Sequence, residues 1–206
     1  STPINVTLVG SSMPVCMLAV GALFFGASVT RQQLVGAVLS ITGVLIVLSR
    51  GEWNQLLALR LVPGDLFMLM ATASWSFYSW LLVRTSEPAS LRGDWAAFLM
   101  AQMVFGLGWS GAFTGVEWSL GHTQIDWGAP LLAALAFIAV GPAVLAYRCW
   151  GVGVQRAGPA VAGFFVNLTP LFAAVLSAAF LGETPHLFHG VAFAFIVGGI
   201  VASSRR

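Results

Sequence analysis

The chain has 206 residues, of which 58% are hydrophobic and only 8% are charged, and its nine basic side chains, all arginine, outnumber the seven acidic ones. A soluble globule of this size cannot bury so much apolar surface, so the composition excludes that class and predicts a protein that lies in a lipid bilayer. The arginines are spread over short connections, which excludes a basic face for nucleic acid. Cys16 and Cys149 carry no disulfide or metal signature.

Seven apolar stretches are long enough to cross the hydrocarbon core as helices, which takes about 20 residues. The alternation typical of a β-barrel is absent, and only these two architectures satisfy the backbone in lipid. The predicted spans cover residues 4–25, 32–49, 64–83, 95–116, 129–149, 159–181 and 187–203. We therefore expect an all-α polytopic membrane protein with seven transmembrane helices.

Most connections are short, but residues 51–63 form a longer connector. Its pattern predicts a helix that lies along the membrane interface, with four apolar side chains turned inward. These are Trp53, Leu56, Leu57 and Leu61.

The arginines predict the orientation, because cytoplasmic loops carry an excess of positive charge. Seven of them fall on one side of the seven spans: Arg31, Arg84, Arg92, Arg148, Arg156, Arg205 and Arg206. Only Arg50 and Arg60 fall on the other side. The C-terminus is therefore expected in the cytoplasm, in a bacterial inner membrane.

An internal repeat relates the two ends of the chain. Without a gap, residues 6–50 align with residues 162–206, and the aligned positions include the same residue types in one frame. The pairs are Pro14 with Pro170, Ala22 with Ala178, Phe24 with Phe180, Gly26 with Gly182, Val35 with Val191, Gly43 with Gly199 and Arg50 with Arg206. Equivalent spans are five apart, an odd number, so the two copies have opposite orientations, as in secondary transporters with inverted repeats.

The repeat predicts how the chain is divided. Residues 1–50 are the last two helices of a first copy, residues 51–63 are the connector, and residues 64–206 are a complete second copy of five helices. A complete first copy would need three more spans, roughly 90 residues at the spacing seen here. The chain is thus expected to be an N-terminally truncated remnant of a ten-helix, 5+5 inverted-repeat transporter.

The run AYRCWGVGVQRAGPAVAGFFVNLTPLFAAVLSAAFLGE, from Ala146, resembles the EamA-type family of the drug/metabolite transporter superfamily. In that family each five-helix repeat ends in a proline-bearing helix, a Leu-Gly-Glu turn and a Gly-rich helix. Matching positions here are Pro170, Leu181, Gly182, Glu183 and Gly199, while Trp75 and Arg84 fit the start of the second repeat. The first copy departs from the pattern, with Ala27 where the family often carries the glutamate.

Polar and proline residues inside the spans are candidates for a substrate cavity. Asn167 and Pro170 share one face of the sixth span, and Ser11 and Pro14 share the equivalent face of the first. A buried amide or hydroxyl needs a partner or a wet cavity, and a proline frees a carbonyl oxygen. Tight helix packing is the alternative, because small and hydroxyl-bearing residues also serve helix interfaces in membranes.

Three further candidates lie deep in the third and fourth spans. Trp75 and Tyr78 can present aromatic faces to an organic substrate or pack against neighbouring helices. Gln102 stands alone in the middle of its span and needs either a cavity or an interhelical hydrogen bond.

The turn before the last span carries Glu183, His186 and His189. Glu183 is a candidate for coupling or gating, although a carboxylate at the start of a helix is also favoured by the helix dipole. The HxxH spacing differs from that of HExxH, so no metal and no other cofactor is expected.

Small residues form stripes on the second and seventh spans, which suit close helix packing or contact with a second copy of the protein. They include Gly36 and Gly43 on the second span and Gly190 and Gly198 on the seventh.

These features predict a secondary transporter, not an enzyme, that exports small metabolites or drug-like solutes by alternating access. No Walker A motif is present, which favours a proton or substrate gradient over ATP as the driving force. The alternatives are an inactive or partial transporter fragment and an intramembrane enzyme that uses the Glu183 turn.

Overall fold

The computed structural model describes residues 1–52, 54, 60, 62–84, 94–121, 127–182 and 186–205. Within these ranges every regular element is a helix, and no strand occurs. The chain forms two compact parts. The larger part comprises Ser1–Arg84 and Gly153–Arg206, and the smaller part comprises Thr85–Val152.

Seven segments of the described chain are long and apolar enough to cross a membrane, which confirms the predicted all-α, seven-span fold. They are Pro3–Phe24, Arg31–Leu48, Pro63–Val83, Trp95–Ser119, Ala129–Ala157, Pro159–Leu181 and Leu187–Ser204. The fifth span runs on to Ala157, whereas the prediction ended it near residue 149. It stops only at Gly158, whose φ of 85° lies in the left-handed region that glycine adopts without strain.

Three of the seven spans are interrupted or change their helical type. The helices of the larger part are α1 (Pro3–Gly10), α2 (Met13–Phe24), α3 (Arg31–Leu48), α5 (Pro63–Arg84), α10 (Pro159–Phe165), the 3₁₀ turn η2 (Val166–Leu168), α11 (Thr169–Leu181) and α12 (Leu187–Ser204). The smaller part contains α7 (Trp95–Ser119), α8 (Ala129–Ile138), the π-helix η1 (Ala139–Ala146) and the start of α9 (Tyr147–Ala157). The predicted interfacial helix, with Trp53, Leu56, Leu57 and Leu61, falls on residues outside the described chain.

The first span breaks between α1 and α2. Pro14 has no N–H, so it cannot donate to the carbonyl oxygen of Gly10 four residues earlier. The hydroxyls of Ser11 and Ser12 each donate over 2.6 Å to a main-chain oxygen three residues earlier. Side-chain donors therefore satisfy part of the backbone where the helix stops.

The sixth span breaks at the equivalent place, between α10 and α11. Pro170 cannot donate to the carbonyl oxygen of Val166, and the Thr169 hydroxyl donates to that oxygen over 2.7 Å instead. Both interruptions thus follow from one proline at matching positions of the repeat.

In the smaller part, the fifth span changes from α-helix to π-helix around Pro142. A proline inside a helix removes one main-chain donor and requires such an adjustment. Near its end, the guanidinium of Arg148 lies 4.4 Å from the centre of the Trp95 ring. This is a cation–π contact between the fifth span and the first residue of α7.

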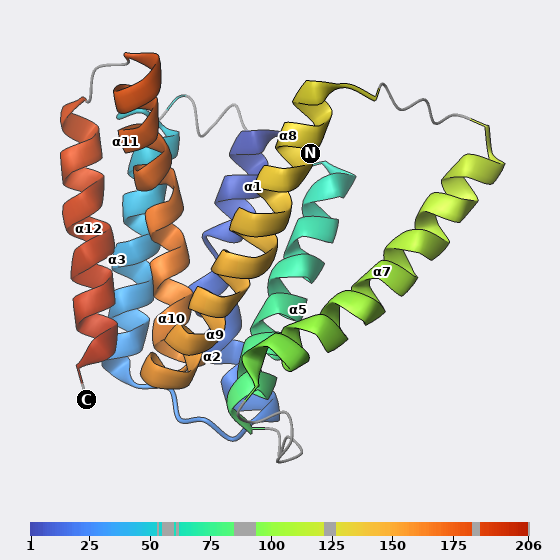
Figure 1. Ribbon diagram of the computed structural model, residues 1–206. Helices are drawn as coiled ribbons and strands as arrows, with labels where there is room; N and C mark the ends of the chain where they lie inside the picture. Colours follow the sequence, from blue (N-terminus) through green and yellow to red (C-terminus); the bar gives the residue numbers. More distant parts are fainter. Residues whose placement is uncertain are drawn as a thin grey trace. The chain divides into compact units, whose positions relative to one another are not determined.

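The core of the larger part is built on the antiparallel pair α3 and α12, which lie side by side in Figure 1. A Cβ on Gly36 would lie 2.6 Å from the carbonyl oxygen of Gly199, and a Cβ on Gly43 would lie 2.8 Å from that of Ala192. No side chain fits in these gaps, so glycine lets the two backbones approach closely. The buried apolar side chains around this crossing are Leu18, Ala37, Val44, Phe164, Leu171, Ala192, Ile196 and Ile200.

Candidate functional site

Asn167 lies in η2, where the sixth span is interrupted, and only 1% of its surface is exposed. Its Nδ2 donates to the hydroxyl oxygen of Ser40 on α3 over 2.8 Å and to the main-chain oxygen of Ser11 over 3.3 Å. Ser11 lies at the interruption of the first span. One amide therefore connects both helix breaks to α3.

The orientation of this amide follows from its partners. The main-chain oxygen of Ser11 can only accept, so the nitrogen of Asn167 must face it. The amide oxygen of Asn167 is buried and has no hydrogen-bond partner in the described part of the chain. An unsatisfied buried acceptor is uncommon and carries a cost in free energy, so this oxygen marks a position where a further donor would be stabilising.

The contacts at this site follow the internal repeat. Ser11 and Asn167 are separated by 156 positions, the offset that aligns the two copies, and they touch each other directly. The same offset relates Ser40 to Ile196 in the centre of the α3/α12 crossing. A pair of equivalent residues can meet only near an axis that exchanges the two copies.

The glycines of the crossing obey the same relation. A Cβ on Gly43 would meet the main chain of α12 at Ala192 and Ile196. A Cβ on Gly199 would meet the main chain of α3 at Gly36 and Ser40. The offset of 156 positions pairs these two residues with Ala192 and Ile196. Because the paired helices are antiparallel, the exchange is a two-fold rotation about an axis across the helices, as an inverted repeat requires.

The four cavity candidates on the interrupted spans lie at or beside the two helix breaks of the larger part. Ser11, Pro14 and Asn167 are buried, and Pro170 is half-buried. Asn167 and Ser11 are hydrogen-bonded between helices, the packing alternative considered for them. Their contact with a substrate stays a prediction.

Trp75 and Tyr78 lie on α5 of the same part and are both half-buried. Their ring centres are 5.3 Å apart and the planes are tilted by 50°. The neighbouring face of α5 carries three buried hydroxyl side chains, each bonded back to its own helix. These are Thr72, Ser76 and Ser79. The aromatic pair therefore flanks the packed face of α5.

The remaining candidates lie on other elements or outside the described residues. Gln102 is half-buried on α7 in the smaller part. Glu183 lies outside the described residues, so its role in coupling or gating stays a prediction. Gly36 and Gly43 pack against α12, but a Cβ on Gly190 or Gly198 would meet nothing within 4 Å in the described chain. Contact of these two glycines with a second copy of the protein stays a prediction.

His189 has a structural role at the start of α12. Its Nδ1 accepts a hydrogen bond from the main-chain N–H of His186 over 3.0 Å. This bond caps α12 and occupies Nδ1 of His189, one of the two histidines that the enzyme hypothesis required. The described residues contain no group of three metal-ligating side chains.

A second buried polar cluster was not predicted. Asn5 on α1 donates from Nδ2 to a carboxylate oxygen of Asp65 and to the main-chain oxygen of Arg60, each over 2.9 Å. Asp65 also accepts from the main-chain N–H of Val62 over 2.7 Å and from the Ser1 hydroxyl. The cluster joins the start of the first span to the start of the third. Its signal in the sequence was Asp65, the sole acidic residue within the seven predicted spans.

Comparisons with known proteins agree with this fold. Residues 62–205 match the model of the EamA-like transporter family. The chain is similar to "Uncharacterized transporter YyaM" of Bacillus subtilis (strain 168), with 24% identity over 99% of this chain and 65% of the relative. It is also similar to "Uncharacterized transporter YetK" of the same organism, with 28% identity over 92% of this chain and 56% of the relative.

The chain thus spans 56% to 65% of the length of these curated relatives. A solved crystal structure shares the fold, with a TM-score of 0.67 at 19% identity, over 98% of this chain and 67% of that chain. The family match covers well over half of the 206 residues and confirms the resemblance that the motif around Pro170 indicated. This chain, a multi-pass membrane protein with seven spans, belongs to the EamA-like transporter family.

Proposed function

We propose that the protein is a secondary transporter that exports small metabolites or drug-like solutes by alternating access. The observation that carries the proposal is the meeting of two proline-interrupted spans at an internal two-fold, with Asn167 bonded to Ser11 across it. Discontinuous helices at the interface of inverted repeats are the usual substrate and gating elements of secondary transporters. The family to which the chain belongs and the names of its relatives support a role in membrane transport.

The two interruptions give these spans the property that alternating access needs. An unbroken helix moves as a rod, whereas a span with a proline break can move its halves separately at a small cost. Side-chain donors at both breaks satisfy main-chain oxygens that a regular helix would satisfy itself. The half-buried pair Trp75 and Tyr78 supplies aromatic surface for an organic solute. A proton or substrate gradient would drive the cycle, in the bacterial inner membrane.

Flux in proteoliposomes tests the proposal. The purified protein should move solutes from a panel of labelled metabolites and cationic dyes along an imposed gradient, without ATP. Trp75→Ala should raise the KM by about fivefold, because contact between a ring and a cationic or aromatic solute contributes about 1 kcal/mol. Trp109→Ala, on the exposed surface of α7, is the matched control and should leave the KM unchanged.

Correct insertion into the bilayer with no flux of any solute would instead favour the alternative of a partial transporter. Flux that is equally changed by both tryptophan substitutions would remove Trp75 from the proposed cavity.

A further inference from the structure

The hydrogen bond between Asn167 and Ser40 has no counterpart in the other half of the repeat. The offset of 156 relates Asn167 to Ser11 and Ser40 to Ile196. The equivalent contact would therefore join the hydroxyl of Ser11 to an isoleucine, which can neither donate nor accept a hydrogen bond. This bond breaks the symmetry of a crossing whose glycine contacts are otherwise symmetric.

We propose that the Asn167–Ser40 hydrogen bond is a conformational lock that favours the present arrangement of the two repeat copies over the one in which they exchange roles. The proposal rests on the proposed function, because an inverted-repeat carrier alternates between two such arrangements. The close contacts that glycines make between α3 and α12 are the same in both arrangements, because the symmetry exchanges each contact with its equivalent. A bond that only one arrangement can form shifts the equilibrium toward it.

The position of Ser40 makes it suited to this role. Its side chain is fully buried on α3, and its main-chain nitrogen lies 2.9 Å from where a Cβ on Gly199 would be. The close α3/α12 crossing therefore fixes the hydroxyl in place. Asn167, in contrast, lies in the short turn η2 between two half-helices. A movement of the break relative to α3 must stretch this bond.

The amide of Asn167 is held from its nitrogen side alone. Nδ2 bonds to both Ser40 and Ser11, whereas Oδ1 is buried without a partner in the described residues. Loss of the Ser40 acceptor removes the shorter of the two bonds, 2.8 Å against 3.3 Å. Ser40 is thus a positioning residue that acts through Asn167.

Accessibility of single cysteines measures the equilibrium without any need for substrate. Ala71→Cys and Leu82→Cys place reporters on either side of Trp75 and Tyr78 along α5. Each is introduced separately into a background with Cys16→Ser and Cys149→Ser, and labelled in proteoliposomes with a maleimide. The ratio of the two labelling rates reports which end of the face is open.

Ser40→Ala should raise the labelling rate of whichever reporter is less reactive in the background protein. The expected change in the ratio is about fivefold, the effect of one hydrogen bond. The maximal transport rate and the KM should both change, because a shift in the equilibrium alters the fraction of the protein that can bind substrate. Thr42→Ala is the matched control, because its hydroxyl bonds to the carbonyl oxygen of Val38 in the same helix; the ratio should not move.

Asn167→Ser is the second variant, because it installs the residue type of the equivalent position and is too short to reach Ser40. It should shift the ratio in the same direction as Ser40→Ala and by at least as much, because it also removes the bond to Ser11. The double variant should give no shift beyond that of Asn167→Ser. A ratio that stays within twofold in both single variants, or shifts that simply add in the double variant, would overturn the proposal. Failure of the proposed function appears separately, as absent flux from a protein whose labelling ratio still responds.

Discussion

The indole of Trp80 joins α5 to α2 by a hydrogen bond and by packing. Its Nε1 donates to the main-chain oxygen of Met17 over 2.8 Å, and its ring stacks on Phe25 at a centre distance of 5.6 Å. The ring lies over Gly21, where a Cβ would be 2.3 Å from it. The glycine therefore creates the space in which the indole sits, and the indole fixes the separation of the two helices.

We expect Trp80→Phe to lower the free energy of unfolding by about 1–2 kcal/mol, because the hydrogen bond is lost and the smaller ring leaves a gap. Thermal unfolding in detergent, followed by the amount of protein that stays monodisperse, measures the change. Trp109→Phe, at a side chain that is 71% exposed, is the control and should have a much smaller effect. Equal losses in the two variants would show that the Trp80 contact contributes nothing specific.

The α3/α12 pair is stabilised by the close approach of two backbones, and α12 offers two adjacent glycines that separate this effect from helix propensity. A Cβ on Gly199 would lie 2.6 Å from a carbonyl oxygen of α3, whereas a Cβ on Gly198 would meet nothing within 4 Å. Gly199→Val should therefore cost about 1–3 kcal/mol or more through overpacking, while Gly198→Val should be close to neutral. The melting temperature of each variant in detergent measures the difference.

The same pair of variants addresses the predicted contact with a second copy. If Gly198→Val reduces the melting temperature in liposomes but not in monomeric detergent solution, a partner covers that face of α12. If it has no effect in either medium, the stripe of Gly190 and Gly198 is not an interface. A destabilisation by Gly198→Val that equals that of Gly199→Val in detergent would contradict the packing described here.

At the level of elements, the sequence predicts what depends on local pattern. Apolar runs of span length predicted all seven helices, and Pro14 and Pro170 marked the two interrupted spans. The end of the fifth span was missed, because the prediction ended it beside Arg148, whereas the helix runs on past Arg148 and Arg156 to Gly158.

Partners across helices could not be predicted, since they depend on how the helices cross. The pattern identified Asn167 as a polar residue that needs a partner, but not that Ser40 supplies it. Asn5 and Asp65 are 60 positions apart, and only the packing of α1 against α5 brings them together. The small stripe of α12 was predicted through Gly190 and Gly198, while the backbone contact with α3 uses Gly199, one position further round the helix.

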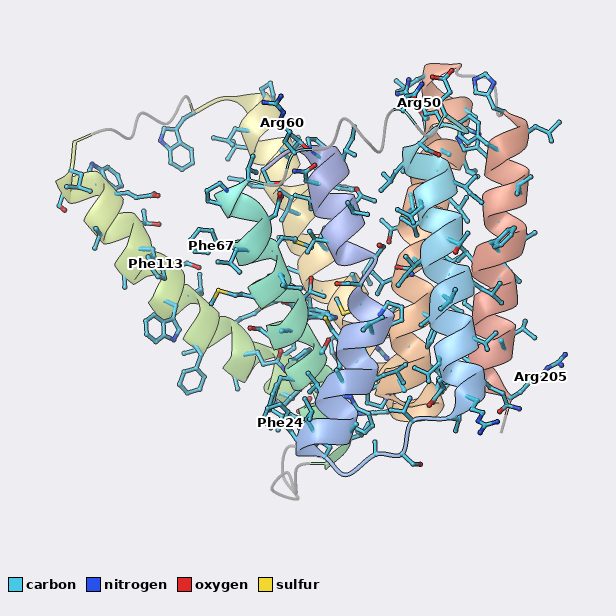
Figure 2. The ribbon with its side chains drawn as sticks, turned by 180° about the vertical axis from the view of Figure 1, so that it is seen from behind. Phe24, Arg50, Arg60, Phe67, Phe113 and Arg205 are labelled. Carbon is cyan, nitrogen blue, oxygen red and sulfur yellow. The ribbon has the colours of Figure 1, made fainter. Side chains whose placement is uncertain are left out.

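For the whole molecule, the direction in which the chain crosses the membrane decides which end of the proposed pathway faces the cytoplasm. In the larger part, Arg50 and Arg60 lie at one end and Arg205 at the other (Figure 2). This separation agrees with an odd number of spans between them, and the count of arginines over the chain favours the Arg205 end as cytoplasmic. The internal repeat predicts the same separation, because inverted copies place equivalent turns on opposite faces of the membrane.

A topology measurement in intact cells tests this orientation. Glu52→Cys, beside Arg50, should react with a membrane-impermeant maleimide added outside, whereas Ser204→Cys, beside Arg205, should react only after the cells are permeabilised. A fluorescent protein fused after Arg206 should fold and emit, because the cytoplasm permits its maturation and the export route does not. Both cysteines are made in the background without Cys16 and Cys149, and labelling of both after permeabilisation controls for their reactivity. Reaction of Ser204→Cys in intact cells, together with a dark fusion, would reverse the orientation and with it the direction of the proposed export.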